Sequence, residues 1–583
     1  MVEKQMLFYY TVCNSRRKGK TMITVVLSWI YIFIICFLLG VGVFSLSTKL
    51  CGKKDFTAPV SLLTVLGVMV STVITSYISC VAGIGMLAHL FLVVLAVLSA
   101  VWQRRQLVVY WKKIKSVVLS WEGFFYFCFI LFIAFFASRG EFHTDTNIYH
   151  AQNIRIYEEY GLIKGMGNLQ QHFAYNSSYL AFAAVFSMKW LLGQSLHTTT
   201  GFLEVLFCIY AFYGLKRWKS HKKHLADCVK LGIPFYVLVI LVRSMSPATD
   251  FGTMLFVQYL LAAWCDNLEG KKDIFFYSLL SVVAVFVVTM KFSACLIVLL
   301  AIYPAVCLIR DRQWRTILFC LLSGILVVCS FLIRNFLISG WLLYPFDKID
   351  LFHVAWKVPR EYLLRDSAQI KVWGRCLYDV DLLDLSPVQW IPYWWEGQER
   401  YEQMFLGSAL MGTLLLGVEA IYGRIRRIQI AWDKVVLAAV IYANIILWFF
   451  MAPFIRYGLA FLLAVPMLAL GEWCSTEKKG FYSIVSGGLV FCIVVCLSPY
   501  WDRYITDGGV FLKHHLTDSY YVKQQDYDRG NMESLQINGN EIYYDATYDE
   551  VNSYFTCPGT CYKTMLERST LMGDEITDGF MAR

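Results

Sequence analysis

The sequence carries little charge for its length. Of its 583 residues, 16% are charged and 58% are hydrophobic, whereas roughly 25% of the residues in an ordinary soluble domain are charged. The mean hydropathy is +0.54. This composition excludes a string of soluble domains, a disordered protein, a nucleic-acid-binding protein and a disulfide-rich secreted scaffold. The net charge of +10 therefore does not require an anionic partner, and the positions of the cations matter more than their number.

The sequence also lacks CxxC pairs, His clusters and internal repeats. The first two absences leave no recognisable metal site, and the third weighs against a transporter, because many transporters are built from repeats. Most of the 18 Cys lie in apolar runs, where they indicate small hydrophobic side chains inside helices. Cys557 and Cys561 differ because they lie in a polar tail, where they form either a disulfide in an oxidising compartment or two free thiols.

Long apolar runs are what the chain has in abundance. A helix needs about 20 apolar residues to cross a bilayer core about 30 Å thick. Residues 21–46 and 58–102 contain no charged residue, and the second run is long enough for two spans. Further runs lie at 123–138, 177–193, 199–215, 231–245, 250–265, 274–290, 292–309, 316–333, 404–422, 435–455, 457–471 and 480–501. We predict an all-α polytopic membrane protein with about 13 to 15 transmembrane helices, in which one of the two runs within 177–215 does not cross.

Basic residues in short loops predict the orientation, because Lys and Arg accumulate on the cytoplasmic side. Three basic segments, 103–115, 216–230 and 423–434, are expected in the cytoplasm. The polar loops 139–176 and 339–403 are then expected outside. The residues after 500 carry 14 Asp and Glu against 7 Lys and Arg, and they are expected outside as well.

Three domains follow from this pattern. Residues 22–501 form the predicted transmembrane domain, and residues 502–583 a small extracytoplasmic α+β module with strand-like runs at 536–537 and 541–544 around an Asn-Gly turn. Residues 1–21 form an N-terminal extension. Their cations conflict with the orientation, so a start at Met22 is the alternative.

Polar residues are densest where the first outer loop begins. Glu141, His143 and Asp145 precede Tyr149 and His150, and residues 146–160 are patterned as an amphipathic helix. Asp145 could simply cap that helix, but capping requires none of the other four residues. Ionisable groups at such a position are candidate functional groups.

Further polar residues are expected at the same face. They are Asn176, Asp250, Lys291, Arg334, Asn335, Arg456 and Tyr457. Single charges at helix ends are usually anchors, whereas cations and acids that converge suit a lipid-phosphate headgroup beside a general base. The loop 339–403 adds six Trp, which favour either anchoring at the membrane surface or stacking on sugars.

Taken together, these motifs resemble the GT-C superfamily of integral membrane glycosyltransferases. Residues 145–150, Asp-Thr-Asn-Ile-Tyr-His, are similar to an Asp-x-x-x-Tyr-His element in the first external loop of bacterial members. Ser-Pro-x-x-Asp at 246–250, Arg-Asn-x-x-x-Ser-Gly at 334–340, Tyr-Pro-Phe at 344–346, Ala-Pro-x-x-Arg-Tyr at 452–457 and Asp-Gly-Phe at 578–580 look like further motifs of one bacterial subfamily.

The resemblance covers most of residues 22–583 and implies an activity. A sugar on a polyprenyl phosphate is transferred to a saccharide or lipid acceptor at the outer face of the bacterial cytoplasmic membrane, for envelope polysaccharide or glycolipid assembly. Asp145, with Glu141 nearby, matches the catalytic carboxylate, and the other polar residues are expected to bind substrate. A divalent cation held by Glu141, His143 and Asp145 is an option. The alternatives are a polysaccharide polymerase or ligase, a flippase, and a scaffold without chemistry.

Overall fold

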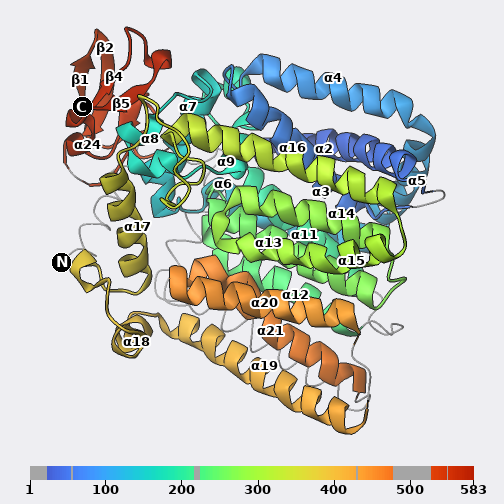
Figure 1. The fold of residues 1–583 in the computed structure, drawn as a ribbon. Helices are drawn as coiled ribbons and strands as arrows, with labels where there is room; N and C mark the ends of the chain where they lie inside the picture. The colour runs from blue at the N-terminus through green and yellow to red at the C-terminus, as the bar shows by residue number, and fades with distance from the viewer. Residues whose placement is uncertain (1–22, 54–56, 216–223, 428–430, 477–526, 548) are drawn as a thin grey trace, which may run out of the picture.

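The structure is a computed structural model. It describes residues 23–53, 57–215, 224–427, 431–476, 527–547 and 549–583. The predicted N-terminal extension 1–21 and the apolar run 480–501 lie outside these residues. The described chain is a bundle of long helices with a small strand-containing module at one end (Figure 1).

Nine helical segments of the described chain are long and apolar enough to cross a membrane. Seven are single helices: α2 (Ile23–Leu50), α3 (Val60–Ser79), α6 (Trp121–Arg139), α16 (Trp314–Ser339), α19 (Arg400–Ile425), α20 (Trp432–Met451) and α21 (Ile455–Thr476). The other two join a helix to a 3-10 segment: α12 (His224–Ile240) with η4 (Leu241–Arg243), and η5 (Phe292–Ala301) with α15 (Ile302–Arg310). These segments indicate a multi-pass membrane protein.

The predicted count of about 13 to 15 spans is higher than the number found in the described residues. Three apolar runs form short helices: α9 (Ser178–Val185) with α10 (Lys189–Leu192), α11 (Thr199–Leu215), and α14 (Ile274–Met290). A fourth run forms α13 (Thr249–Leu268), which is buried along almost its whole length. Helices enclosed by other helices do not face lipid, so their length and apolarity are less constrained.

The second half of the run 58–102 ends in a sharp bend. Helix α4 (Met86–Trp102) meets α5 (Arg104–Val118) at 94°, and α5 carries the cations of the basic segment 103–115. This segment was predicted as a loop. It is instead an amphipathic helix, the form that lies along a membrane surface with its cations toward water.

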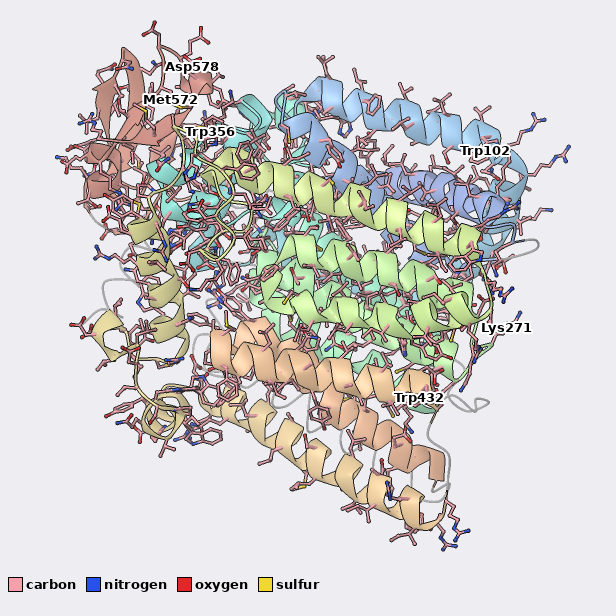
Figure 2. The ribbon with its side chains drawn as sticks, in the orientation of Figure 1. Trp102, Lys271, Trp356, Trp432, Met572 and Asp578 are labelled. Atoms are coloured by element: carbon pink, nitrogen blue, oxygen red, sulfur yellow. The ribbon has the colours of Figure 1, made fainter. Side chains whose placement is uncertain are left out.

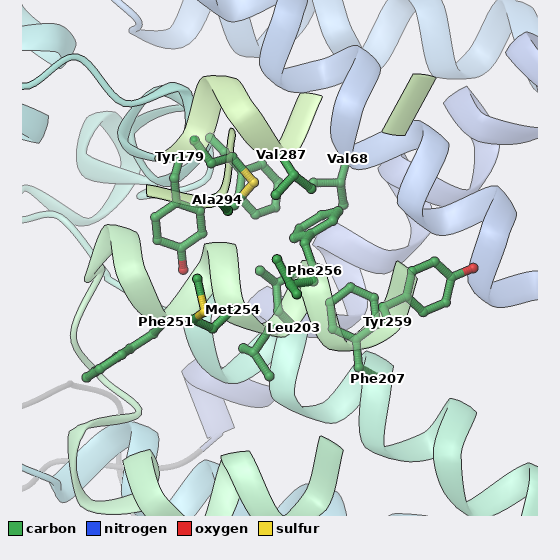
Figure 3. Close-up of a cluster of buried hydrophobic side chains, with 14 of the residues drawn as sticks. Val68, Tyr179, Leu203, Phe207, Phe251, Met254, Phe256, Tyr259, Val287 and Ala294 are labelled. Carbon is green, nitrogen blue, oxygen red and sulfur yellow. The ribbon is translucent and has the colours of Figure 1, made fainter. Parts of the chain in front are cut away.

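Helix α13 forms the centre of the apolar core (Figure 3). Its Phe256 and Tyr259 pack against Phe207 of α11, and the Phe207 and Tyr259 rings stack with their centroids 4.9 Å apart. Side chains from four further segments surround this group: Val68, Tyr179, Val287 and Ala294. The core therefore joins helices from most of the chain around α13.

Helices α2 and α3 cross at two glycines. A Cβ added at Gly67 would lie 1.6 Å from the Cys36 carbonyl oxygen, and one added at Gly40 would lie 1.7 Å from the Leu63 carbonyl oxygen. Small residues of this kind let two membrane helices approach each other closely.

Replacing Gly67 should destabilise the bundle. Gly67→Ala places a methyl group against backbone, and overpacking of this kind costs about 1–3 kcal/mol. We expect a lower thermal-unfolding midpoint in detergent than for wild type. The matched control is Gly324→Ala in α16, because a Cβ there meets no atom within 4 Å. Equal midpoints for the two variants would contradict the close α2–α3 contact.

The bundle has two different ends (Figure 2). Trp102, Lys271 and Trp432 lie at one, and Trp356, Met572 and Asp578 at the other. We call the second the loop end, because the segments 139–176 and 339–403 and the C-terminal module gather there (Figure 1). That the loop end faces outward stays a prediction.

The two loops at this end contain short helices. The first has η2 (Thr146–His150), α7 (Ala151–Glu159), α8 (Met166–Leu169) and η3 (Gln171–Ala174), and the second has α17 (Arg360–Gly374), η6 (Val380–Leu382) and α18 (Pro387–Glu396). Helix α7 buries polar as well as apolar residues, including Gln152 and Asn153. The surface helix predicted at 146–160 is therefore enclosed by the module and the bundle.

The C-terminal module contains two small sheets. Strands β1 (Met532–Ile537) and β2 (Asn540–Asp545) form an antiparallel hairpin, and β3 (Gly559–Thr560) pairs with β2 in parallel. The rest comprises α24 (Lys563–Glu567), β4 (Ser569–Leu571), η7 (Ile576–Asp578) and β5 (Phe580–Ala582). The hairpin turns at Asn538 and Gly539, both with positive φ, as the Asn-Gly sequence predicts.

The module docks on the first loop through buried hydrogen bonds. Gln170 Oε1 accepts from Asn552 Nδ2 and from the Cys561 amide, each at 3.1 Å, and Gln170 Nε2 donates to the Ile148 carbonyl at 3.2 Å. Beyond them, the Phe580 amide donates to the Lys164 carbonyl at 2.8 Å, with the Phe580 side chain fully buried.

Cys557 and Cys561 are both free thiols, the second of the two alternatives that the sequence leaves open. Cys561 Sγ instead donates to the Ile148 carbonyl at 3.2 Å. The sulfur of Cys561 is therefore part of the docking surface.

Candidate functional site

Two carboxylates and two cations meet at the loop end. Arg456 Nη2 lies 3.1 Å from Asp145 Oδ2, and Arg456 Nε lies 3.2 Å from Asp250 Oδ2. Lys291 Nζ lies 3.1 Å from Asp250 Oδ1. We call these four residues the ion-pair cluster. Asp250 is fully buried, whereas the side chains of Asp145, Lys291 and Arg456 keep 17%, 17% and 28% exposure, so a ligand reaches those three first.

Each member of the ion-pair cluster lies at the end of a helix. Asp250 is the second residue of α13 and Arg456 the second of α21, and both helices begin just after a proline. Lys291 lies between α14 and η5, where its extended backbone breaks the helical path. The two prolines and the extended Lys291 each interrupt a helical path. The helix ends that result bring together segments that are far apart in the sequence.

Asp145 does not cap a helix. Its backbone is helical, with φ −59° and ψ −22°, and its side chain makes no capping hydrogen bond. It precedes a π-helical turn in which the Ala151 amide donates to the Thr146 carbonyl. Turns of this kind carry an extra residue and are frequent at functional sites. The capping explanation is therefore wrong, and the carboxylate pairs with Arg456.

His143 completes the group around Asp145. Its Nε2 accepts a hydrogen bond from Arg456 Nη1 at 2.6 Å. The other ring nitrogen, Nδ1, lies 3.1 Å from the Asp145 amide nitrogen and 3.7 Å from Asp145 Oδ1. Ser246 Oγ accepts from the His143 amide at 2.6 Å and so holds this loop against the start of α13.

The surroundings keep Asp145 charged and His143 neutral. Burial would raise the pKa of the Asp145 carboxyl, but Arg456, with His143 and His150, holds this pKa below its ordinary value. Burial lowers the pKa of His143 to about 4. At neutral pH the site therefore holds two carboxylates, an uncharged imidazole and two cations.

Three aromatic side chains line the same region. Tyr457 lies under Lys291, whose Nζ is 3.8 Å from the ring centroid. Tyr149 packs on His150, with centroids 4.2 Å apart. His150 is fully buried, neither of its ring nitrogens has a hydrogen-bond partner in the described structure, and burial lowers its pKa to about 3. A neutral imidazole of this kind suits hydrogen bonding to a ligand hydroxyl.

Arg334 and Asn176 form a separate group. Arg334 is fully buried; its Nε donates to Asn176 Oδ1 at 3.1 Å, and its guanidinium lies 4.7 Å from the Tyr157 ring centroid. Asn335 follows Arg334 in α16, and its side-chain amide donates to the Leu342 carbonyl at 3.1 Å. This hydrogen bond ties the end of α16 to the loop that follows it, and substrate binding by Asn335 stays a prediction.

No group of three or more His, Cys, Asp or Glu side chains that could hold a metal occurs among the described residues. The metal-holding option for Glu141, His143 and Asp145 therefore has no geometric support. Glu141 is half-buried, and its amide donates to the Val242 carbonyl at 2.7 Å.

Sequence reasoning missed some of the residues that connect the site. Gln170 and Asn552 join the module to the first loop, and Asp366 of α17 accepts hydrogen bonds from Tyr175 and Tyr344. Asp366 is a buried acid in a loop expected to be solvated. No pattern along the chain signals partners separated by more than a hundred residues.

The family model described as a domain of unknown function (DUF8201) matches residues 22–463. The chain belongs to this family. The match includes all four residues of the ion-pair cluster and ends before the C-terminal module. No curated protein and no solved structure matches the chain. The description of the DUF8201 family assigns no activity, so the chemistry of the site carries the functional argument.

The buried neutral His143 should make stability depend on pH. Its pKa falls from 6.5 unfolded to about 4 folded, so its stabilising contribution is complete above pH 6.5 and is lost as the pH falls toward 4. Between pH 7 and pH 4.5 this amounts to about 2–3 kcal/mol. His143→Gln should therefore flatten the pH dependence of the thermal-unfolding midpoint. His353→Gln, at an exposed position, is the control, and a slope for His143→Gln as steep as the control's would contradict the assignment.

Proposed function

We propose that the chain is a membrane glycosyltransferase that moves a sugar from a polyprenyl-phosphate donor to a saccharide or lipid acceptor. The observation that carries this proposal is the ion-pair cluster at the loop end, with a partly exposed Asp145 beside a partly exposed Arg456. Such a transfer needs a base for the acceptor and cations for the departing phosphate. The GT-C resemblance of the motifs supports the same class.

The ion-pair cluster contains both components, because the proposed base Asp145 directly contacts the cation Arg456. In the proposed step the acceptor oxygen forms a bond to the anomeric carbon while the bond from that carbon to the phosphate oxygen breaks. The acceptor proton passes to the Asp145 carboxylate, and the electron pair leaves with the phosphate. Arg456 and Lys291 balance the new charge, and the planar guanidinium suits two-point contact with phosphate.

Asp250 positions the cations in this scheme. It is buried and pairs with Arg456 and Lys291 at once, so both cations are held before substrate arrives. Arg456 also pairs with Asp145, which keeps that carboxylate a weak base in the free protein. A donor phosphate that draws Arg456 away would strengthen Asp145 as a base when the substrate is present.

The neighbouring residues suit sugar hydroxyl groups. The two unpartnered nitrogens of His150 and the phenols of Tyr149 and Tyr457 lie around the charged group. A donor anchored in the bilayer by a prenyl chain also requires an enzyme inside the membrane. We place the reaction at the outer face of the bacterial cytoplasmic membrane, in envelope polysaccharide or glycolipid assembly.

A polysaccharide polymerase or ligase is the second candidate. The loop 339–403 reaches the first loop through Asp366, whose Oδ2 accepts from Tyr344 at 2.9 Å and whose Oδ1 accepts from Tyr175. A long ordered loop over the site suits a growing chain. A flippase is less favoured, because the charged residues gather at one end of the bundle and not at mid-membrane.

Removing the base should slow transfer strongly while leaving the protein folded. Asp145→Asn should lower the rate by about 10²- to 10⁴-fold, and Arg456→Ala should lower it by a similar factor through loss of charge stabilisation. The assay follows a labelled sugar moving from polyprenyl-phosphate sugars in membranes. Asp384→Asn, at an exposed position of the same end, should keep wild-type activity.

The products of the same assay distinguish the candidates. A single added sugar supports the glycosyltransferase, and a ladder of lengths supports the polymerase. Movement of the lipid-linked sugar across the bilayer without transfer would favour the flippase. Full activity in Asp145→Asn would overturn the base assignment.

A further inference from the structure

A cavity of about 260 Å³ lies between α17 and the C-terminal module. Its walls come from three parts of the chain: Gln171 of the first loop, α17, and the C-terminal module, at Glu550 and around α24. Helices α17 and α24 lie beside each other in Figure 1. The cavity is near the lower end of the volumes typical of small-molecule sites. None of its lining residues belongs to the ion-pair cluster.

Two guanidinium groups face this cavity. Arg365 comes from α17 and Arg568 follows α24. Neither forms an ion pair with a carboxylate in the described part of the chain, and Arg568 lies over the Tyr362 ring, 3.7 Å from its centroid. Burial, and then the charge of Arg365, lower the pKa of Arg568. Two like charges brought together, neither of them in contact with a carboxylate, favour an anionic ligand.

The rest of the wall suits a sugar ring. Gln171 and Gln369 offer amides that both donate and accept hydrogen bonds, and Trp373 offers an aromatic surface. Glu550 also lines the cavity, where it accepts a hydrogen bond from Tyr562 Oη at 3.2 Å. Its single negative charge leaves the cavity with an excess of one positive charge.

The cavity is connected to the ion-pair cluster through aromatic contacts. Gln171 precedes His172, whose ring stacks on Tyr149 with centroids 5.3 Å apart and lies 6.2 Å from the Tyr562 ring. Tyr149 belongs to the turn that follows Asp145. Packed rings therefore link the wall of the cavity to the turn beside the proposed base.

We propose that this cavity binds an anionic sugar unit, bearing a carboxylate or a phosphate, and that it holds the acceptor of the transfer reaction. The binding of an anionic sugar stands on the cavity alone, whereas its role as acceptor rests on the proposed function. Arg365 and Arg568 contact the anion, and Trp373 with the two glutamines contacts the ring and its hydroxyl groups.

Direct binding to the full chain in lipid nanodiscs tests the proposal. The probes are glucuronic acid and glucose 1-phosphate, with glucose as the neutral comparison, followed by saturation-transfer NMR. We expect at least one anionic sugar to bind roughly tenfold or more tightly than glucose, because charge-assisted hydrogen bonds are lost with the neutral ring. A preference for glucuronic acid indicates a carboxylate ligand, and one for glucose 1-phosphate a phosphate ligand.

Variants of the two arginines locate the binding. Arg365→Gln, at an exposed position, and the double variant with Arg568→Gln should each weaken anion binding. The matched control is Arg360→Ala in the same helix, because Arg360 pairs with Asp347 outside the cavity. Binding of glucose as tight as the anions, no binding of either anion, or unchanged anion binding in Arg365→Gln would each overturn the proposal.

A third variant separates this proposal from the proposed function. Asp145→Asn should still bind the anionic sugar while losing transfer. Anion binding in a protein without transferase activity would leave the cavity assignment intact and remove its role as acceptor site. Transfer with no anion binding would leave the proposed function intact and overturn the cavity assignment.

Discussion

The paired contacts of Arg456 with Asp145 and Asp250 hold the loop end together. They join α13, α21 and the loop after α6, and Lys291 adds the break between α14 and η5. Removing such charges from water is expensive, and burial of an ion pair is weak evidence for stability. The cluster is better understood as an arrangement that keeps charges in position for a ligand, since three of its members remain partly exposed.

The position of Asp145 depends on the C-terminal module as well as on the membrane helices. The turn after Asp145 receives hydrogen bonds at the Ile148 carbonyl from Gln170 and Cys561, and the Asn552 amide donates to the Asn147 carbonyl at 2.9 Å. A module at the far end of the sequence thus supports the turn beside the proposed base. The same docking creates the cavity beside α17, so one interface serves both proposed parts of the site.

Because charged residues are scarce in this chain, the charged groups of the ion-pair cluster are informative about function. A polytopic chain exposes mostly apolar surface to lipid, and a buried charge inside it is costly unless it is paired or functional. The core around α13 agrees with that rule, because the aromatic side chains of Phe207, Phe256 and Tyr259 fill the centre of the bundle. The charges gather where those helices end.

The sequence by itself determined the class of protein, because a long apolar run has few alternatives to a membrane helix. It also located the polar residues at 141–150, 250, 291 and 456 and the Asn-Gly hairpin of the module. Among the described residues, fewer helices than the predicted 13 to 15 are long and apolar enough to cross a membrane, because periodicity cannot tell an enclosed short helix such as α14 from one facing lipid. Only the tertiary structure decided that Asp145 faces Arg456 and caps no helix, that Arg334 pairs with Asn176 away from the cluster, and that Cys561 bonds to a carbonyl and not to Cys557. Each of these depends on partners far apart along the chain, and their distance in space is set by packing, which no local pattern records.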